Sequence, residues 1–228
     1  MLRHYGRRKG SKKKPISIPV PSVFINLERS ADRRERFTVS AKQEARGCFY
    51  STAKEKGKTL QVERLVAVDG KEIVSPIQGV TNNEYACIQS HLNAIKLAKE
   101  RGYECIAIFE DDITFVKDFK PKFEKYLNQL PKDWHILYLG GSFGRYPYYF
   151  NQYFTQQNQT WGAFAYIVHK RAYNNLIEML SCPKKIVDGH YIDYQKSHLC
   201  IKPNERLVIH PKGFSTIKEI EVNYKGIQ

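Results

Sequence analysis

Short apolar runs alternate along the chain with segments whose apolar residues recur at helical intervals. The apolar runs are typical of buried strands, and the amphipathic segments are typical of helices. Strands that alternate with helices predict an α/β fold with a mainly parallel sheet and flanking helices. The predicted strands cover residues 23–27, 60–68, 105–109, 135–139 and 162–168, and the predicted helices begin at residue 32 or cover 81–101, 121–130, 170–180 and 187–198.

The clearest predicted helix starts after Thr81. Thr81 and Glu84 have the spacing of a capping box, in which each side chain binds the backbone N–H of the other residue. Ser90 and His91 lie one residue off the apolar stripe, at the margin of the predicted buried face. The stripe itself consists of Tyr85, Ile88, Leu92 and Ile95, and Arg101-Gly102 ends the helix.

Three consecutive acids, Glu110, Asp111 and Asp112, end the apolar run CIAIF. The carboxyl ends of parallel strands form the ligand crevice of an open α/β sheet. Adjacent carboxylates repel one another unless a cation lies among them, and Mg²⁺ or Mn²⁺ bind through one or two carboxylates plus substrate phosphates. The triplet therefore favours a nucleotide-dependent transferase, and a solvated loop explains it equally well.

Other segments predict further groups at this edge. Arg29, Arg33 and Arg34 surround the start of a helix that Ser30 can cap, where guanidinium groups and backbone N–H groups suit a diphosphate. Asp69-Gly70 predicts a tight turn, and Gly140-Gly141 after a strand allows close backbone approach to a ligand. The aromatic segment 143–154 is predicted to be a loop or lid.

The formal net charge of +14 is spread unevenly over the 228 residues. Residues 1–14 contain seven Lys and Arg residues and no acid, which leaves +7 for the rest. We expect residues 1–19 to form a basic, disordered tail and linker, and residues 20–228 to form a single domain. Such charge favours a polyanionic partner, either a glycan or DNA, although a merely solubilising tail fits the run as well.

The sequence contains no run near the roughly 18 apolar residues of a membrane span, and its first residues lack the apolar centre of a secretory signal. The five cysteines include no C-x-x-C pair, which argues against a zinc site or a disulfide framework. We therefore expect a protein of the cytoplasm, either of a cell or of an infected host cell.

Six segments occur in a specific order between residues 22 and 194: FINLERSADRRERF, VAVDG, EYACIQSHLNAI, IAIFEDDITF, WGAFAYIVHKRAYNNLI and IVDGHYIDY. Through these segments the chain resembles glycosyltransferase family 25, which includes lipooligosaccharide galactosyltransferases and collagen hydroxylysine galactosyltransferases. The resemblance implies a GT-A-type, Rossmann-like fold, a UDP-sugar donor and a Mn²⁺ or Mg²⁺ ion.

The resemblance also implies roles for individual residues. Asp112 would be the principal metal ligand, with Glu110 beside it and His210 as a third candidate, although the family's carboxyl-terminal P-x-x-x-x-Q pattern is only loosely matched here. The residues implied for nucleotide-sugar binding are Asn26, Leu27, Arg29, Arg33, Asp69, Ser90, His91, Glu110 and Asp111.

An inverting transfer requires a base that deprotonates the acceptor hydroxyl. Asp188 is the first candidate, with Asp193 and His190 as alternatives. The candidates for acceptor binding are Gly140, Gly141, Trp161 and Tyr166, and for the two aromatic rings core packing is the stronger explanation.

Three other interpretations stay open at this point. The acceptor of a glycosyltransferase could be a hydroxymethylated base in DNA, since a basic surface with aromatic residues suits a flipped base. The acidic cluster also fits a nuclease with two close metal ions. A non-catalytic module that binds a sugar nucleotide would carry the same motifs.

Overall fold

The computed structural model describes residues 16–52, 54–55, 58–59, 61–143, 148–211, 213–215 and 220–222. The helices are α1 (Ala31–Glu44), α2 (Asn82–Glu100), α3 (Phe119–Leu127), α4 (Lys170–Ser181) and α5 (Val187–Gln195). The strands are β1 (Val20–Asn26), β2 (Phe49–Tyr50), β3 (Lys54–Glu55), β4 (Lys58–Thr59), β5 (Glu63–Val66), β6 (Cys105–Glu110), β7 (Thr114–Phe115), β8 (Ile136–Phe143), β9 (Tyr148–Tyr149), β10 (Phe154–Gln156), β11 (Thr160–His169), β12 (Cys200–Pro203), β13 (Val208–Ile209), β14 (Gly213–Ser215) and β15 (Ile220–Val222). The predicted tail at residues 1–14 lies outside the described residues.

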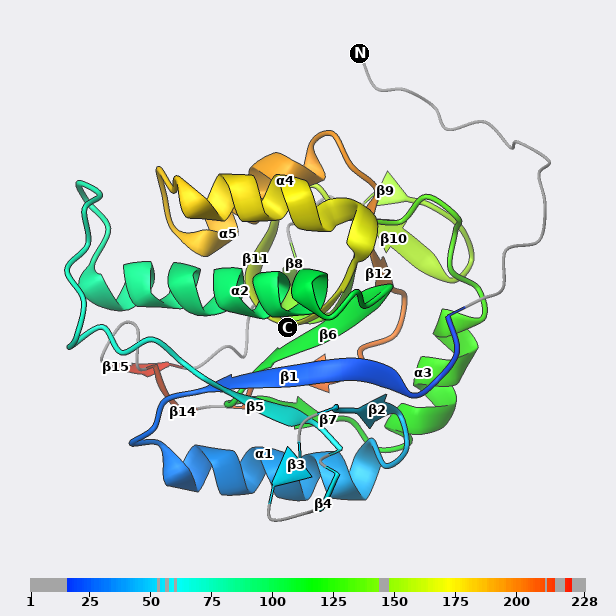
Figure 1. Ribbon diagram of the computed structural model, residues 1–228. Coiled ribbons are helices and arrows are strands. Elements are labelled where there is room, and N and C mark those ends of the chain that lie inside the picture. The colour runs from blue at the N-terminus through cyan, green and yellow to red at the C-terminus, as the bar shows by residue number, and fades with distance from the viewer. Residues whose placement is uncertain are drawn as a thin grey trace.

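The main sheet has the strand order β2-β1-β6-β11-β8-β12-β10-β9, and β5 also pairs with β1 (Figure 1). Strand β1 runs parallel to β2, β5 and β6, and β12 runs parallel to β8. Strand β11 is antiparallel to both of its neighbours, β6 and β8. The predicted α/β fold is confirmed, with parallel pairing around β1 and antiparallel pairing in the middle of the sheet.

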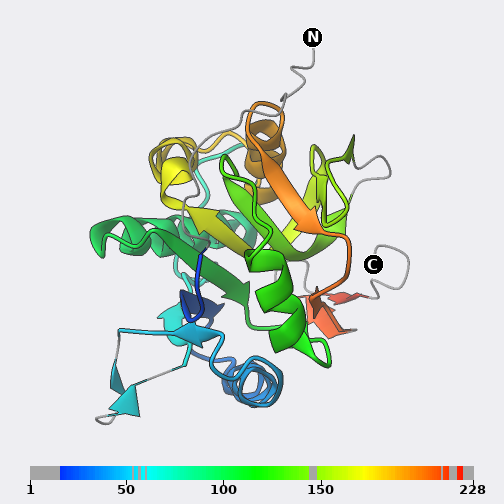
Figure 2. The ribbon, with the colours of Figure 1, turned by 90° about the vertical axis from the view of Figure 1, so that its right-hand side faces the viewer.

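Helices cover both faces of this sheet, as Figures 1 and 2 show. On one face, α2, α4 and α5 bury aliphatic residues such as Ile88, Ile95 and Leu176 against β1, β6 and β11. The other face packs against α1 and α3 through a phenylalanine layer, whose neighbouring rings lie 4.4–6.0 Å apart between centroids. The layer consists of Phe24, Phe37, Phe49, Phe109, Phe115, Phe119 and Phe123.

The predicted capping box of α2 is confirmed. The Glu84 amide donates to Thr81 Oγ1 at 3.2 Å, and the Thr81 amide donates to Glu84 Oε2 at 2.8 Å. The helix ends before Gly102, which adopts a left-handed φ of 64°. Ser90 and His91 are fully buried instead of marginal, because Ser90 faces the segment after β5 and accepts from the Val68 amide, and His91 packs against Tyr166 of β11.

Three local predictions were wrong. Ser30 precedes α1 but its side chain makes no capping hydrogen bond, and its carbonyl instead accepts from Asn26. The strand expected over 60–68 covers Glu63–Val66 among the described residues, and it ends before Val68 because the Val68 amide donates to Ser90 Oγ at 2.9 Å. Gly140 and Gly141 lie inside β8 instead of after a strand.

The described part of the segment predicted as a loop, 143–154, contains a hairpin. Strand β9 pairs with β10 in antiparallel register, and β10 continues the main sheet through β12. Among the described residues, no helix is long and apolar enough to cross a membrane.

Gly140 allows an aromatic ring to pass directly over β8. A Cβ at this position would lie 2.3 Å from Cε2 of Phe164 and 3.0 Å from the Val208 carbonyl oxygen. We expect Gly140→Ala to lower the free energy of unfolding by about 1–3 kcal/mol, the usual cost of overpacking a core. Chemical denaturation measures this change.

Gly189→Ala is the matched control, because the same change there meets only the flexible chain of Lys185 and improves helix propensity. Equal loss of stability in the two variants would contradict the packing argument.

Candidate functional site

A pocket lies at the edge of the sheet where β1, β5 and β6 end. Seven of the nine residues predicted to bind the nucleotide sugar line it: Leu27, Arg29, Arg33, Ser90, His91, Glu110 and Asp111. The other two contact the lining, since Asn26 binds Asp111 and Asp69 forms an ion pair with Arg29. The structure thus brings the predicted set together at one place.

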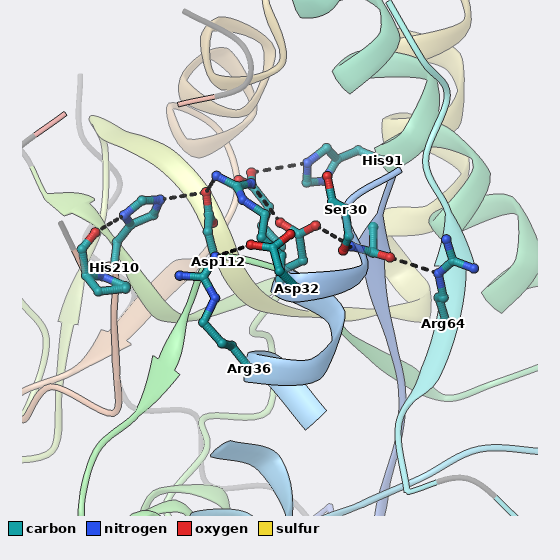
Figure 3. Close-up of polar contacts among 12 residues, drawn as sticks. Ser30, Asp32, Arg36, Arg64, His91, Asp112 and His210 are labelled. Carbon is teal, nitrogen blue, oxygen red and sulfur yellow. Dashed lines mark hydrogen bonds and ion pairs between the residues drawn. The ribbon is translucent and has the colours of Figure 1, made fainter. Parts of the chain in front are cut away.

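Glu110, Asp111 and Asp112 form an acidic corner at the end of β6, and Figure 3 labels Asp112. Asp111 is held from two sides, because Asn26 donates to its Oδ2 at 2.6 Å and Arg33 donates to its Oδ1 at 2.9 Å. Asn26 in turn accepts from Arg64 at 2.9 Å. Hydrogen bonds therefore connect the segment FINLERSADRRERF to the acidic end of β6.

Asp112 lies between two cationic side chains. Arg33 Nη2 is 3.3 Å from Asp112 Oδ2, and His210 Nε2 is 3.0 Å from the same oxygen. His210 Nδ1 lies 2.9 Å from the Pro211 carbonyl oxygen, which can only accept, so Nδ1 carries a proton. Figure 3 shows the contact between His210 and Asp112 as a dashed line.

Charge in this corner is strongly perturbed. Burial and the negative charge of Asp112 raise the pKa of Glu110 well above its usual range. Burial also opposes ionisation of Asp112, but the His210 hydrogen bond and the charges of His210 and Arg33 outweigh it and lower the pKa of Asp112. Arg33 thus supplies part of the positive charge that three adjacent acids require.

Asp112 also has a free ligand position. Among the described residues, Oδ1 of Asp112 is buried and makes no hydrogen bond. Carboxylate oxygens and a histidine nitrogen are ligands that Mn²⁺ and Mg²⁺ accept. Asp112 therefore fits the predicted cation through its free Oδ1, and His210 lies against its other oxygen, Oδ2, at 3.0 Å.

His91 belongs to a buried hydrogen-bonded row of side chains. Its Nδ1 lies 2.7 Å from the Tyr166 hydroxyl, which lies 2.8 Å from the Tyr191 hydroxyl. Its Nε2 lies 3.6 Å from Glu110 Oε1. Burial lowers the pKa of His91 to about 4, so the ring is neutral at pH 7 and its contact with Glu110 is not an ion pair.

Asp188 accepts hydrogen bonds from the backbone of β11 with both of its carboxylate oxygens. The Gly162 amide donates to Oδ2 at 2.9 Å and the Ala163 amide donates to Oδ1 at 3.2 Å, beside an irregularity in the β11–β8 register. Gly162 has a φ of 67°, which a residue with a side chain rarely adopts. Asp188 therefore shapes the backbone next to Trp161.

The alternatives to Asp188 are bound to nearby lysines and to local backbone. Hydrogen bonds from Lys185 and Lys196 lower the pKa of Asp193 to about 2. His190 Nε2 accepts from the Lys184 amide at 3.1 Å. Neither Asp193 nor His190 is among the residues that line the pocket.

The candidates for acceptor binding divide into two groups. Tyr166 is fully buried and hydrogen-bonded, so the prediction that its ring stacks on an acceptor was wrong, and core packing explains it. At Gly140 the close approach is to Phe164 instead of a ligand, and the neighbouring Gly141 is buried in β8. Trp161 is 44% exposed and stays a candidate.

Cys87 is a pocket residue that the sequence reasoning missed. The search for C-x-x-C pairs overlooks a cysteine whose partner is a histidine. The signal is the four-residue spacing of Cys87 and His91, which places both side chains on one face of α2.

Residues 20–194 match glycosyltransferase family 25, described as an LPS biosynthesis protein family. The chain belongs to this family. Its α/β fold has a mixed sheet that is parallel around β1 and flanked by helices.

Several curated family 25 proteins are similar to the chain. Procollagen galactosyltransferase 1-A of Xenopus laevis is 34% identical over 56% of this chain and 22% of its own length. Procollagen galactosyltransferase 1 of Danio rerio is 30% identical over 51% of this chain and 20% of its own length. A probable inactive glycosyltransferase 25 family member 3 of Bos taurus is 29% identical over 56% and 23%. The chain spans about a fifth of the length of these relatives.

Solved structures of glycosyltransferases are more distant from this family 25 chain. A glycosyltransferase involved in glycosylation of the major capsid of PBCV-1 has a TM-score of 0.38 and 10% identity, over 72% of this chain and 66% of that one. Galactosyltransferase LgtC, in complex with donor and acceptor sugar analogues, has a TM-score of 0.39 and 10% identity, over 79% and 72%.

We expect Arg33→Met to lower the free energy of unfolding by about 3–5 kcal/mol, because it leaves the buried carboxylate of Asp111 and the partly buried one of Asp112 without their shared cation. Urea denaturation in the presence of a chelator measures this loss without interference from added metal.

Arg36→Met, one turn along α1, is the matched control, since its ion pair with Asp32 is exposed and contributes little. Similar denaturation midpoints for the two variants would show that Arg33 does not hold the acidic corner.

Proposed function

We propose that the chain is a metal-dependent, inverting glycosyltransferase that moves a hexose from a UDP-sugar to a hydroxyl group of a saccharide. The observation that carries this proposal is the pocket at the ends of β1, β5 and β6, where family 25 motifs from distant parts of the sequence converge. Galactose is the first donor sugar to test, because two of the relatives above are named galactosyltransferases.

The pocket offers complementary groups for a sugar diphosphate. Arg29 and Arg33 line it and bring positive charge to the amino-terminal end of α1. Ser90 fixes the segment after β5, because its hydroxyl oxygen accepts from the Val68 amide, and this bond holds the opposite wall of the pocket. These residues would bind and orient the donor.

Asp112 would hold the predicted Mn²⁺ or Mg²⁺, with Glu110 and His210 as further ligands. When bound, such an ion neutralises charge on the departing diphosphate. Arg33 contributes to the same neutralisation from the protein side, because its guanidinium already lies beside Asp111 and Asp112.

Asp188 is the proposed base. In the transfer, the acceptor oxygen forms a bond to the anomeric carbon, the bond to the diphosphate breaks with its electron pair, and Asp188 takes the hydroxyl proton. Each Asp188 oxygen accepts one backbone N–H and keeps a second lone pair. Trp161, exposed beside Gly162, would stack on the acceptor.

A DNA acceptor carrying hydroxymethylated bases is an alternative substrate within the same reaction class, and the net charge of +14 favours it. A binding module without turnover is a second candidate, because one relative is named a probable inactive family member. Family membership gives no support to the nuclease interpretation.

Incubation of the protein with Mn²⁺ and a panel of UDP-sugars tests the activity. The proposal expects slow release of UDP from one donor, since water replaces the acceptor when none is present. Binding of a donor without release, with saccharide and DNA acceptors both supplied, would favour the non-catalytic module.

We expect Asp112→Asn to abolish Mn²⁺-dependent binding of UDP, because the amide keeps the shape of the side chain but loses its charge. Calorimetry with UDP, with and without Mn²⁺, measures the effect, and circular dichroism checks the fold. Asp133→Asn is the control, since Asp133 is exposed and pairs only at 3.5 Å with Arg171. Unchanged affinity in Asp112→Asn would remove Asp112 from the metal site.

We expect Asp188→Asn to keep donor binding and to lose transfer by roughly 10²–10⁴-fold, the range of general base catalysis. Steady-state kinetics with donor and acceptor varied separately would show a fall in kcat at unchanged donor KM. Near-normal kcat would assign the base role to Asp193 or His190 instead.

A further inference from the structure

Three side chains of different chemistry meet at one wall of the pocket. Cys87 and His91 lie one turn apart on α2, and Glu110 ends β6 opposite them. One potential ligand atom from each lies within 4.8 Å of the other two. All three residues line the pocket, so an ion can reach them from solvent.

The imidazole of His91 is already oriented for coordination. Its Nδ1 is engaged by the Tyr166 hydroxyl at 2.7 Å, and Tyr166 is fixed in turn by Tyr191. The remaining nitrogen, Nε2, lies 3.6 Å from Glu110 Oε1. Histidines that bind metals usually have their second nitrogen held by such a hydrogen bond.

The distances are compatible with a tetrahedral ion. Zn²⁺ bonds of about 2.0–2.3 Å to N, O and S place neighbouring ligand atoms roughly 3.3–3.6 Å apart. The His91–Glu110 separation of 3.6 Å already has this value, and the Cys87 sulfur lies within 4.8 Å of the ligand atoms of the other two residues.

We propose that Cys87, His91 and Glu110 bind a borderline-soft transition-metal ion such as Zn²⁺, with its fourth position open to the pocket. On binding, the Cys87 thiol loses its proton to solvent and coordinates as thiolate. Sulfur and imidazole ligands separate this site from the oxygen-rich position at Asp112, which suits Mn²⁺ or Mg²⁺.

Glu110 lines the pocket beside Cys87 and His91 and is also a proposed ligand at Asp112, so the two sites would share this carboxylate. If the pocket holds the nucleotide sugar, as the proposed function requires, Zn²⁺ at Cys87 would compete with the donor. The metal site itself does not depend on that function, because it is defined by side chains that are present without any nucleotide.

Titration with Co²⁺ in the absence of nucleotide tests the site directly. A cobalt–thiolate bond gives a charge-transfer absorption in the near ultraviolet, and we expect it to saturate at one ion per chain. Cys87→Ser should abolish the band. Cys182→Ser, which removes an exposed cysteine outside the cluster, should leave it unchanged. Absence of the band in the natural protein, or its survival in Cys87→Ser, overturns the proposal.

Two further measurements guard against a variant that fails to fold. Tyr166→Phe leaves all three ligands in place but releases His91 Nδ1, and it should weaken Co²⁺ binding roughly 10–100-fold. Zinc-soaked crystals of the natural protein should show an anomalous peak between the three side chains. A peak only at Asp112 would refute the Cys87 site and leave the proposed function intact.

Discussion

The site depends on the two hydrogen bonds that Asn26 and Arg33 donate to Asp111. Asn26 ends β1, Arg33 lies in the first turns of α1, and Asp111 follows β6, so two hydrogen bonds join three elements at one corner. The carboxylate is 8% exposed, and an unpartnered charge at this depth would be costly. The path of the chain from β1 into α1 is therefore coupled to the position of the acids.

Much of the fold follows from local patterns in the sequence. The capping box at Thr81 and the apolar stripe of α2 depend on neighbours three or four residues away, and α2 was predicted almost to the residue. The predicted strand ends at Leu27 and Phe109 lie within one residue of the observed ends at Asn26 and Glu110, because a buried run that stops at polar residues marks the sheet edge. Since these strands are parallel, their ends gathered the predicted site residues into one pocket.

What the sequence could not reveal depends on contacts between distant residues. Tyr166 belongs to an apolar run like many core tyrosines, and only the packing of α2 and α5 shows its hydroxyl between His91 and Tyr191. Gly140 was interpreted as a ligand approach because the sequence does not reveal that Phe164 occupies the space beside it. Arg33 was expected to face a diphosphate. Its ion pairs with Asp111 and Asp112 join residues far apart in the sequence, so only the folded structure reveals them.

The phenylalanine layer has an electrostatic consequence for the acids above it. Phe109 immediately precedes Glu110, and Phe115 follows a few residues later, so hydrocarbon underlies the strand end. Aromatic rings polarise weakly and exclude water, which lowers the local dielectric constant and lengthens the reach of each charge. The attraction between the carboxylates and a cation that enters the pocket would therefore be weakly screened on the side of the aromatic rings. The part of the phenylalanine layer formed by Phe109 and Phe115 thus both stabilises the sheet and directs the field of the acidic corner toward its solvent side.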